Sequence, residues 1–119
     1  MVAVESEYIV GTYLDDTFGP VLAFGQGGSR VEQISKPQLR LLPLTRTDCA
    51  DVVGKALAEL GELPAESAVS ALIDAVAAVG RFAVAAGERL VELDVNPLVL
   101  SADGRVLAID AVAHFKESE

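Results

Sequence analysis

The sequence predicts an α/β domain of the α+β type: a mostly antiparallel sheet with two helices packed on it. Three observations predict it: alternating β-type residues near the start, two helical stripes in the middle and a polar-faced hairpin near the end. Its 119 residues, 51% of them apolar, are enough for one core, so residues 1–119 form a single domain. Strands are expected near 7–15, 20–25, 38–44, 89–100 and 105–112.

The sequence pattern predicts that the strands at 7–15 and 20–25 form an antiparallel hairpin. Tyr8, Val10, Thr12 and Leu14 alternate with residues of the other face, and a turn at 15–17 ends the run. After the second strand, residues 25–29 read Gly-Gln-Gly-Gly-Ser. Such glycines allow close approach to a ligand, but the run lacks the lysine of a P-loop, so a plain turn is the alternative.

Two helices follow. Thr45 is the expected cap of a helix over residues 45–60, with Asp48 completing a capping box and Gly61 ending it. A second helix is expected to begin between residues 64 and 67 and to end at Gly87. The single cysteine, Cys49, lies on the apolar stripe of the first helix and is expected to be inert core.

The strand at residues 90–96 carries an unusual polar face. Period-two alternation places Glu92, Asp94 and Asn96 on one face together with Leu90, at about 6–7 Å between neighbours. The other face, formed by Val91, Leu93 and Val95, is apolar and is expected to be buried.

The following turn predicts which residue lies opposite Asn96. A three-residue loop ending in Gly104 pairs Ser101 with Arg105, which places Asn96 directly across from Asp110. An amide oxygen and a carboxylate about 5 Å apart can share a hard cation such as Mg²⁺. The alternative is a solvated hairpin whose polar residues simply face water.

These motifs resemble a known family. Residues 92–98, Glu-Leu-Asp-Val-Asn-Pro-Leu, resemble the E-[IL]-x-[IVL]-N-P-L signature in the carboxy-terminal half of ATP-grasp domains of NDP-forming acyl-CoA synthetases and succinyl-CoA synthetase β chains. The resemblance implies that Asn96 and Asp110, fourteen residues apart, are Mg²⁺ ligands, with Glu92 or Asp94 assisting.

A second stretch carries the same resemblance. Residues 16–32 are similar to the family's D-P-x-F-G-P-V-V-x-F-G-x-G-G-x-x-V-E run, which borders the active site. The resemblance therefore implies that Gly27, Gly28 and Glu32 are nucleotide- or phosphate-binding residues. Arg40 is a further candidate for a phosphate, with a neighbouring carboxylate as its alternative partner.

The sequence departs from the family pattern at Lys36, where the family usually has an aspartate, and in two further places. Residues 61–66, Gly-Glu-Leu-Pro-Ala-Glu, replace an arginine-rich R-G-x-R-G segment, and Val112 stands where the family commonly has Arg or Lys. Both changes remove positive charge. The only histidine, His114, is expected to be solvated, because no Ser/His/Asp or Cys/His arrangement surrounds it.

Charge and composition limit the partners. The net charge of −9 argues against nucleic acid and anionic membranes as partners. No signal peptide and no apolar run of membrane-spanning length are recognised, so a cytoplasmic location is expected.

The resemblance implies half of an ATP-grasp domain, which is not a complete enzyme by itself. The expected function is a subunit or fragment of an ADP-forming acyl-CoA synthetase that contributes the Mg²⁺–ATP/ADP half-site. Its partners would be an N-terminal ATP-grasp half or a CoA-binding subunit on another chain, and a homo-oligomer is compatible with the sequence. The alternatives are a non-catalytic ATP-grasp remnant that binds a ligand or regulates a partner, and a plain interaction module.

Overall fold

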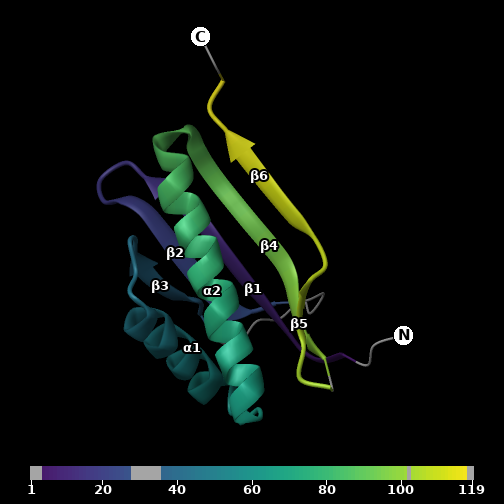
Figure 1. Cartoon of the computed structure of the whole chain (residues 1–119). Helices are drawn as coiled ribbons and strands as arrows, with labels where there is room; N and C mark the ends of the chain where they lie inside the picture. Colours follow the sequence, from purple (N-terminus) through teal and green to yellow (C-terminus); the bar gives the residue numbers. More distant parts are fainter. Residues whose placement is uncertain (1–3, 28–35, 102, 118–119) are drawn as a thin grey trace.

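In the computed structural model, two helices pack on one face of a six-stranded sheet whose main strand order is β3-β2-β1-β4-β5, with β6 also paired to β4 (Figure 1). The structure describes residues 4–27, 36–101 and 103–117. The elements are β1 (Val4–Asp15), β2 (Gly19–Gln26), β3 (Gln38–Leu41), α1 (Arg46–Leu60), α2 (Glu66–Ala86), η1 (Gly87–Arg89), β4 (Leu90–Ser101), β5 (Val106–Ala108) and β6 (Ala111–Phe115). The expected antiparallel sheet with two helices is confirmed.

The core lies between the helices and the sheet face that they cover. Tyr8 and Phe24 stack with ring centroids 5.5 Å apart, and Leu72 and Val76 of α2 are fully buried against this layer. Cys49 is also buried in it, as expected, and burial raises the pKa of its thiol.

The caps of α1 form as the sequence predicts. Thr45 accepts a hydrogen bond from the backbone N–H of Asp48 at 3.1 Å, and the Asp48 carboxylate accepts one from the N–H of Thr45 at 2.9 Å. Gly61 ends the helix with φ of +68°, a left-handed conformation that glycine adopts without a Cβ penalty.

The expectation that no apolar run reaches membrane-spanning length is wrong for α2. The segment Glu66–Arg89 is long and apolar enough, by length and composition alone, to cross a membrane. Its many alanines and valines give a mean hydropathy of 1.7 although polar residues interrupt every run. One such helix is weak evidence, because core helices of soluble domains pass the same test.

Two predicted strands are shorter than expected, and a proline is the reason each time. The strand expected over 38–44 ends at Leu41, since Pro43 has no N–H for a ladder. The strand expected over 105–112 is divided into β5 and β6 around residues 109 and 110. There Ile109 donates to the carbonyl of Pro97 at 3.0 Å, and Pro97 has no N–H to return the bond.

The face assignment of β4 is wrong at its first two residues. Leu90 pairs with Phe115 and Glu92 with His114, so Val91 is an extra residue in a bulge. The bulge turns Leu90 into the core, where it is 5% exposed, and leaves Val91 38% exposed. The remaining alternation of β4 up to Asn96 follows the prediction.

Candidate functional site

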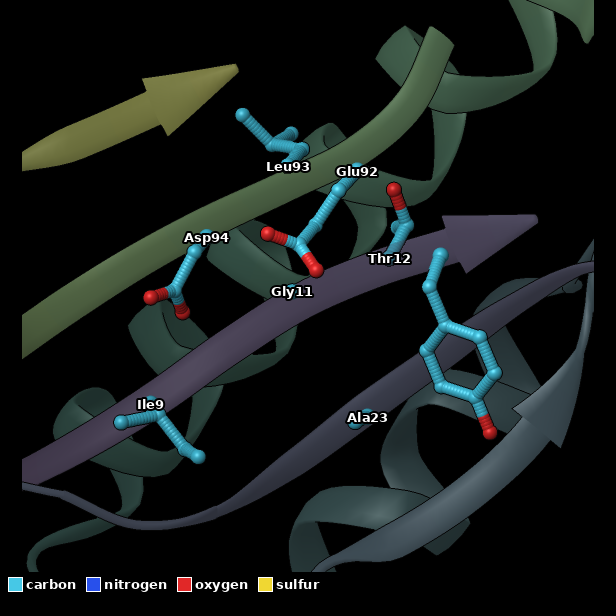
Figure 2. Close-up of a pocket in the computed structure, with 8 residues that line it drawn as sticks. Ile9, Gly11, Thr12, Ala23, Glu92, Leu93 and Asp94 are labelled. Carbon is cyan, nitrogen blue, oxygen red and sulfur yellow. The ribbon is translucent and has the colours of Figure 1, made fainter. Parts of the chain in front are cut away.

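The candidate site lies on the sheet face away from the helices. A shallow recess of about 180 Å³ is lined by residues of β1, β2 and β4, among them Gly11, Ala23, Glu92 and Asp94. Figure 2 shows the carboxylates of Glu92 and Asp94 standing out from β4 on this side, whereas Leu93 between them points away. The structure therefore brings two of the predicted residues together on one exposed face.

Gly11 forms the floor of the recess beside Asp94. The two residues are paired across β1 and β4. A Cβ atom at Gly11 would lie 2.6 Å from the carbonyl oxygen of Leu93 and 3.6 Å from Oδ1 of Asp94. Only glycine allows β1 and β4 to approach this closely, and its missing side chain leaves space under the Asp94 carboxylate.

A second bulge allows Asn96 to lie on the same open sheet face as Glu92 and Asp94. Tyr8 pairs with Leu98 and Val10 with Val95, so the single residue Ile9 faces both Asn96 and Pro97. Without the extra residue, strict alternation would place Leu98 on the open face beside Asn96. The bulge instead buries both Val95 and Leu98 under the helices and leaves Asn96 exposed between them.

The predicted register of the last hairpin is confirmed. Ser101 donates to the carbonyl of Arg105 at 2.8 Å, and Asn96 donates its backbone N–H to the carbonyl of Asp110 at 3.1 Å. Pairs on both sides keep the same alignment, from Leu100–Val106 to Glu92–His114. Asn96 and Asp110 are therefore opposite each other, and both are exposed.

The four oxygen-bearing residues form an open arrangement. Among the described residues, no three or more His, Cys, Asp or Glu side chains lie close enough together to hold an ion by themselves. Asn96 and Asp110 are one strand pair, while Glu92 and Asp94 extend along β4 toward the recess. Any ion here would keep ligands from water or phosphate, which is the usual state of Mg²⁺. The ligand roles of Asn96, Asp110, Glu92 and Asp94 stay predictions.

Gly27 is held against β1 at the end of β2. Its N–H donates to the carbonyl of Glu7 at 3.1 Å, and a Cβ there would lie 2.4 Å from the carbonyl carbon of Tyr8. Close packing of the two strands therefore accounts for this glycine, and its role toward a nucleotide stays a prediction. The other two candidates of this segment, Gly28 and Glu32, lie outside the described residues.

Arg40 lies on the other face of the sheet. It is paired with the buried Leu22, and its guanidinium donates to Oδ2 of Asp51 in α1 at 2.9 Å. That hydrogen bond is the main cause that holds the pKa of Asp51 below its usual value. The structure thus shows the carboxylate partner that the sequence left open, and it does not bring Arg40 together with Asn96 and Asp110.

The acidic segment between the helices has a contact of its own. Glu62 accepts a hydrogen bond of 2.5 Å from the hydroxyl of Tyr8, which is fully buried. A buried hydroxyl needs such a partner. Glu62 therefore connects this segment to β1 on the sheet face that the helices cover.

Sequence reasoning missed the small residues that shape the recess, Gly11 and Ala23. They are paired with each other across β1 and β2, and their small side chains leave the sheet surface uncovered next to the carboxylates of Glu92 and Asp94. A glycine between the β-branched residues Val10 and Thr12 of a strand was the available signal, since such a glycine often marks close approach of another backbone.

Comparison with known proteins identifies the family. A family model described as an ATP-grasp domain matches residues 1–114. The chain is 32% identical to the β subunit of an ADP-forming acetate–CoA ligase I of Pyrococcus furiosus, over 93% of this chain and 49% of that protein. It is 37% identical to an ADP-forming acetate–CoA ligase II of Archaeoglobus fulgidus, over 86% of this chain and 15% of that protein. The chain thus spans about half the length of the related β subunits.

Solved structures agree in fold. A crystal structure of a Pyrococcus horikoshii protein matches with a TM-score of 0.83 and 28% identity, covering 99% of this chain and 52% of that one. The dinucleotide-forming acetyl-coenzyme A synthetase 1 of Ca. Korarchaeum cryptofilum, in complex with coenzyme A and Mg-AMPPCP, matches with a TM-score of 0.77 and 28% identity. That match covers 93% of this chain and 53% of the other. The resemblance stated from the motifs is confirmed.

Proposed function

The chain belongs to the ATP-grasp domain family, and from that premise we propose that it supplies the magnesium–nucleotide half-site of an ADP-forming acyl-CoA ligase. One observation carries the proposal: Asn96 stands directly opposite Asp110 on an exposed sheet face. Glu92 and Asp94 continue that polar row toward the recess above Gly11. The related β subunits and the neighbour that holds Mg-AMPPCP support the choice of ligand.

The residues fit magnesium by their chemistry. All four donors are amide or carboxylate oxygens, the ligand class that Mg²⁺ prefers. When bound, Mg²⁺ neutralises charge on the phosphoryl group that is transferred. We assign Asn96 and Asp110 the role of direct ligands, and Glu92 and Asp94 that of holding metal-bound water. Gly11 leaves the space in which a phosphate oxygen can approach the sheet.

The open face also argues for a second half. Phe18, Leu39 and Leu41 are exposed around a further recess next to β3, on the side that the helices leave uncovered. A net charge of −9 repels a nucleotide, so cations must come from the metal and from the covering part. We propose that an N-terminal ATP-grasp half covers this face, and that a CoA-binding subunit completes an enzyme that couples acyl-CoA formation to ATP.

Calorimetric titration tests the half-site. The chain is titrated with Mg-ADP and Mg-ATP, and the same titrations are run on Asp110→Asn, which removes the charge at constant size. Asp74→Asn is the matched control, because Asp74 makes its ion pair with Arg46 on the helix side. We expect binding by the wild type and the control, and an affinity lower by about tenfold or more in Asp110→Asn, because the substitution removes the negative charge of a metal ligand; tenfold corresponds to about 1.4 kcal/mol.

A titration in the presence of the missing ATP-grasp half tests the case in which the chain alone binds no nucleotide. Should the chain alone bind nothing, the same variants are mixed with the part of the Pyrococcus furiosus β subunit that this chain does not match. Nucleotide binding by the mixture that is equal for wild type and Asp110→Asn would contradict the assignment of Asp110.

A second candidate function is a non-catalytic relative of these domains that binds a ligand or regulates a partner. The Tyr8–Glu62 hydrogen bond favours it, because Glu62 makes a contact inside the fold and the segment 61–66 offers no positive charge to a phosphate. This candidate predicts nucleotide binding without ATP formation when the missing half and a CoA-binding subunit are both added. Turnover in that mixture would reject it.

A further inference from the structure

Strand β6 forms an open edge of the sheet. It pairs with β4 on one side, and within the described part of the chain no strand pairs with its other side. Figure 1 shows β6, in yellow, beyond β4 and away from both helices. All five of its residues are exposed, including Val112 and Phe115 at about half of their surface. Such an edge offers a template for another strand, and β6 has neither the lysine nor the proline that commonly protects one.

The backbone groups available at this edge follow from the β4–β6 ladder. Asn96 donates to the carbonyl of Asp110, and hydrogen-bonded pairs alternate along an antiparallel ladder. Val112 and His114 therefore direct their N–H and C=O groups to β4. Ala111, Ala113 and Phe115 direct theirs away from the sheet, toward a partner strand.

A second copy of the same strand fits these groups in one register. In a two-fold antiparallel pair centred on Ala113, all five residues of β6 are paired, and Ala111 of each copy faces Phe115 of the other. A small side chain thus lies opposite a large one at both ends. The next pair outward is Asp110 with Lys116 of the other copy, so opposite charges meet twice.

We propose that the chain forms a two-fold homodimer through antiparallel pairing of β6 with β6, centred on Ala113. The sheets of the two copies then form one continuous sheet. The net charge of −9 per chain disfavours indiscriminate association, so the local complementarity of Asp110 and Lys116 sets the register. The pairing also places Lys116 of the second copy beside the candidate ligand Asp110, on a strand where Val112 contributes no charge.

Single-cysteine cross-linking tests the register. Ala113 faces its own copy across the two-fold axis, where Cα atoms of a hydrogen-bonded pair are about 5.5 Å apart, within disulfide range. We expect Ala113→Cys to form a covalent dimer under mild oxidation. Ala111→Cys is the matched control, because residue 111 faces residue 115 and not itself. The native Cys49 is 1% exposed and gives no background.

Sedimentation velocity over a concentration series measures the unmodified interface. We expect the wild type to dimerise, Lys116→Arg to match it, and Lys116→Glu to raise the dimer dissociation constant by about tenfold, because two attractive pairs become repulsive. Lys116 lies beyond β6, so its substitution leaves the fold intact. A wild type that stays monomeric up to its solubility limit overturns the proposal. So does Ala113→Cys that cross-links no better than Ala111→Cys, or a dimer that Lys116→Glu does not weaken.

Discussion

At the scale of single residues, two glycines explain how the uncovered face is shaped. Gly11 lies against Leu93 of β4 and Gly27 against Tyr8 of β1, and neither has room for a methyl group, because an added Cβ would lie 2.6 Å and 2.4 Å from backbone atoms of these neighbours. Gly54 is the opposite case, because it lies exposed in α1 with open space around it. The same residue type is therefore required at two positions and unfavourable at the third.

We predict that Gly27→Ala destabilises the chain by about 1–3 kcal/mol, because the added methyl group forces the end of β2 away from Tyr8. Gly54→Ala should instead stabilise it by up to about 1 kcal/mol through helix propensity. Urea unfolding of the three proteins checks this. Equal midpoints for Gly27→Ala and wild type would show that the strands separate without strain.

At the scale of elements, β4 contributes apolar residues to the core and also exposes the polar row formed by Glu92, Asp94 and Asn96. Its core-facing residues are the buried Leu90, Val95 and Leu98 and the half-buried Leu93, and their spacing of three, two and three positions is one that a regular strand cannot place on one face. The two bulges absorb the extra residues Val91 and, opposite Ile9, Pro97. Glu92, Asp94 and Asn96 are exposed together as a result.

The hairpin that ends β4 gives a prediction about acid. The Ser101 hydroxyl donates to the Asp103 carboxylate, and this bond, followed by that from the Arg105 backbone N–H, holds the pKa of Asp103 below its usual 3.8. A lowered folded pKa stabilises the fold above the unfolded pKa, and this stability is lost as pH falls through the folded pKa. Asp103→Asn should therefore be less stable than wild type at neutral pH, with a difference that shrinks below about pH 4.

Urea unfolding between neutral pH and the acid limit of the folded state measures that difference. Asp16→Asn in the exposed β1–β2 turn is the control for a carboxylate lost from another turn. A stability difference between wild type and Asp103→Asn that stays constant with pH would argue against the Ser101–Asp103 bond.

At the scale of the whole molecule, the sheet has one face that the helices cover and one face that they leave open. The helices bury Tyr8, Leu22 and Phe24, and within the described residues no helix covers the face of Glu92 and Asp94. Leu39 and Leu41 are half-exposed there although both are large and apolar. This asymmetry is typical of a domain that completes its structure against another one.

Neighbouring leucines on the two faces test this division. Leu22 is 0% exposed and Leu39 is 48% exposed. We expect Leu22→Ala to lower the free energy of unfolding by about 2–5 kcal/mol, as in other cores. Leu39→Ala should change it by less than about 1 kcal/mol, yet weaken association with an added ATP-grasp half. Equal losses of stability in chemical unfolding would contradict the division.

The sequence by itself determined the elements, the hairpin register and the family. Local signals were sufficient there: Thr45 and Asp48 specify a cap, Gly104 specifies the turn, and the turn fixes which residue faces Asn96. The spacing of Asn96 and Asp110 could be recognised because turn geometry and strand period are both local properties.

Tertiary structure decided which residues share a face and which are separated. The bulges at Val91 and opposite Ile9 depend on neighbouring strands, and so do the floor at Gly11 and the turn of Arg40 toward Asp51. Each depends on packing between segments that are distant in the chain, and strand period alone carries no information about such contacts. The row of Glu92, Asp94 and Asn96 was therefore predictable from the sequence. The close approach of Gly11 beneath it and the position of Arg40 on the opposite face were not.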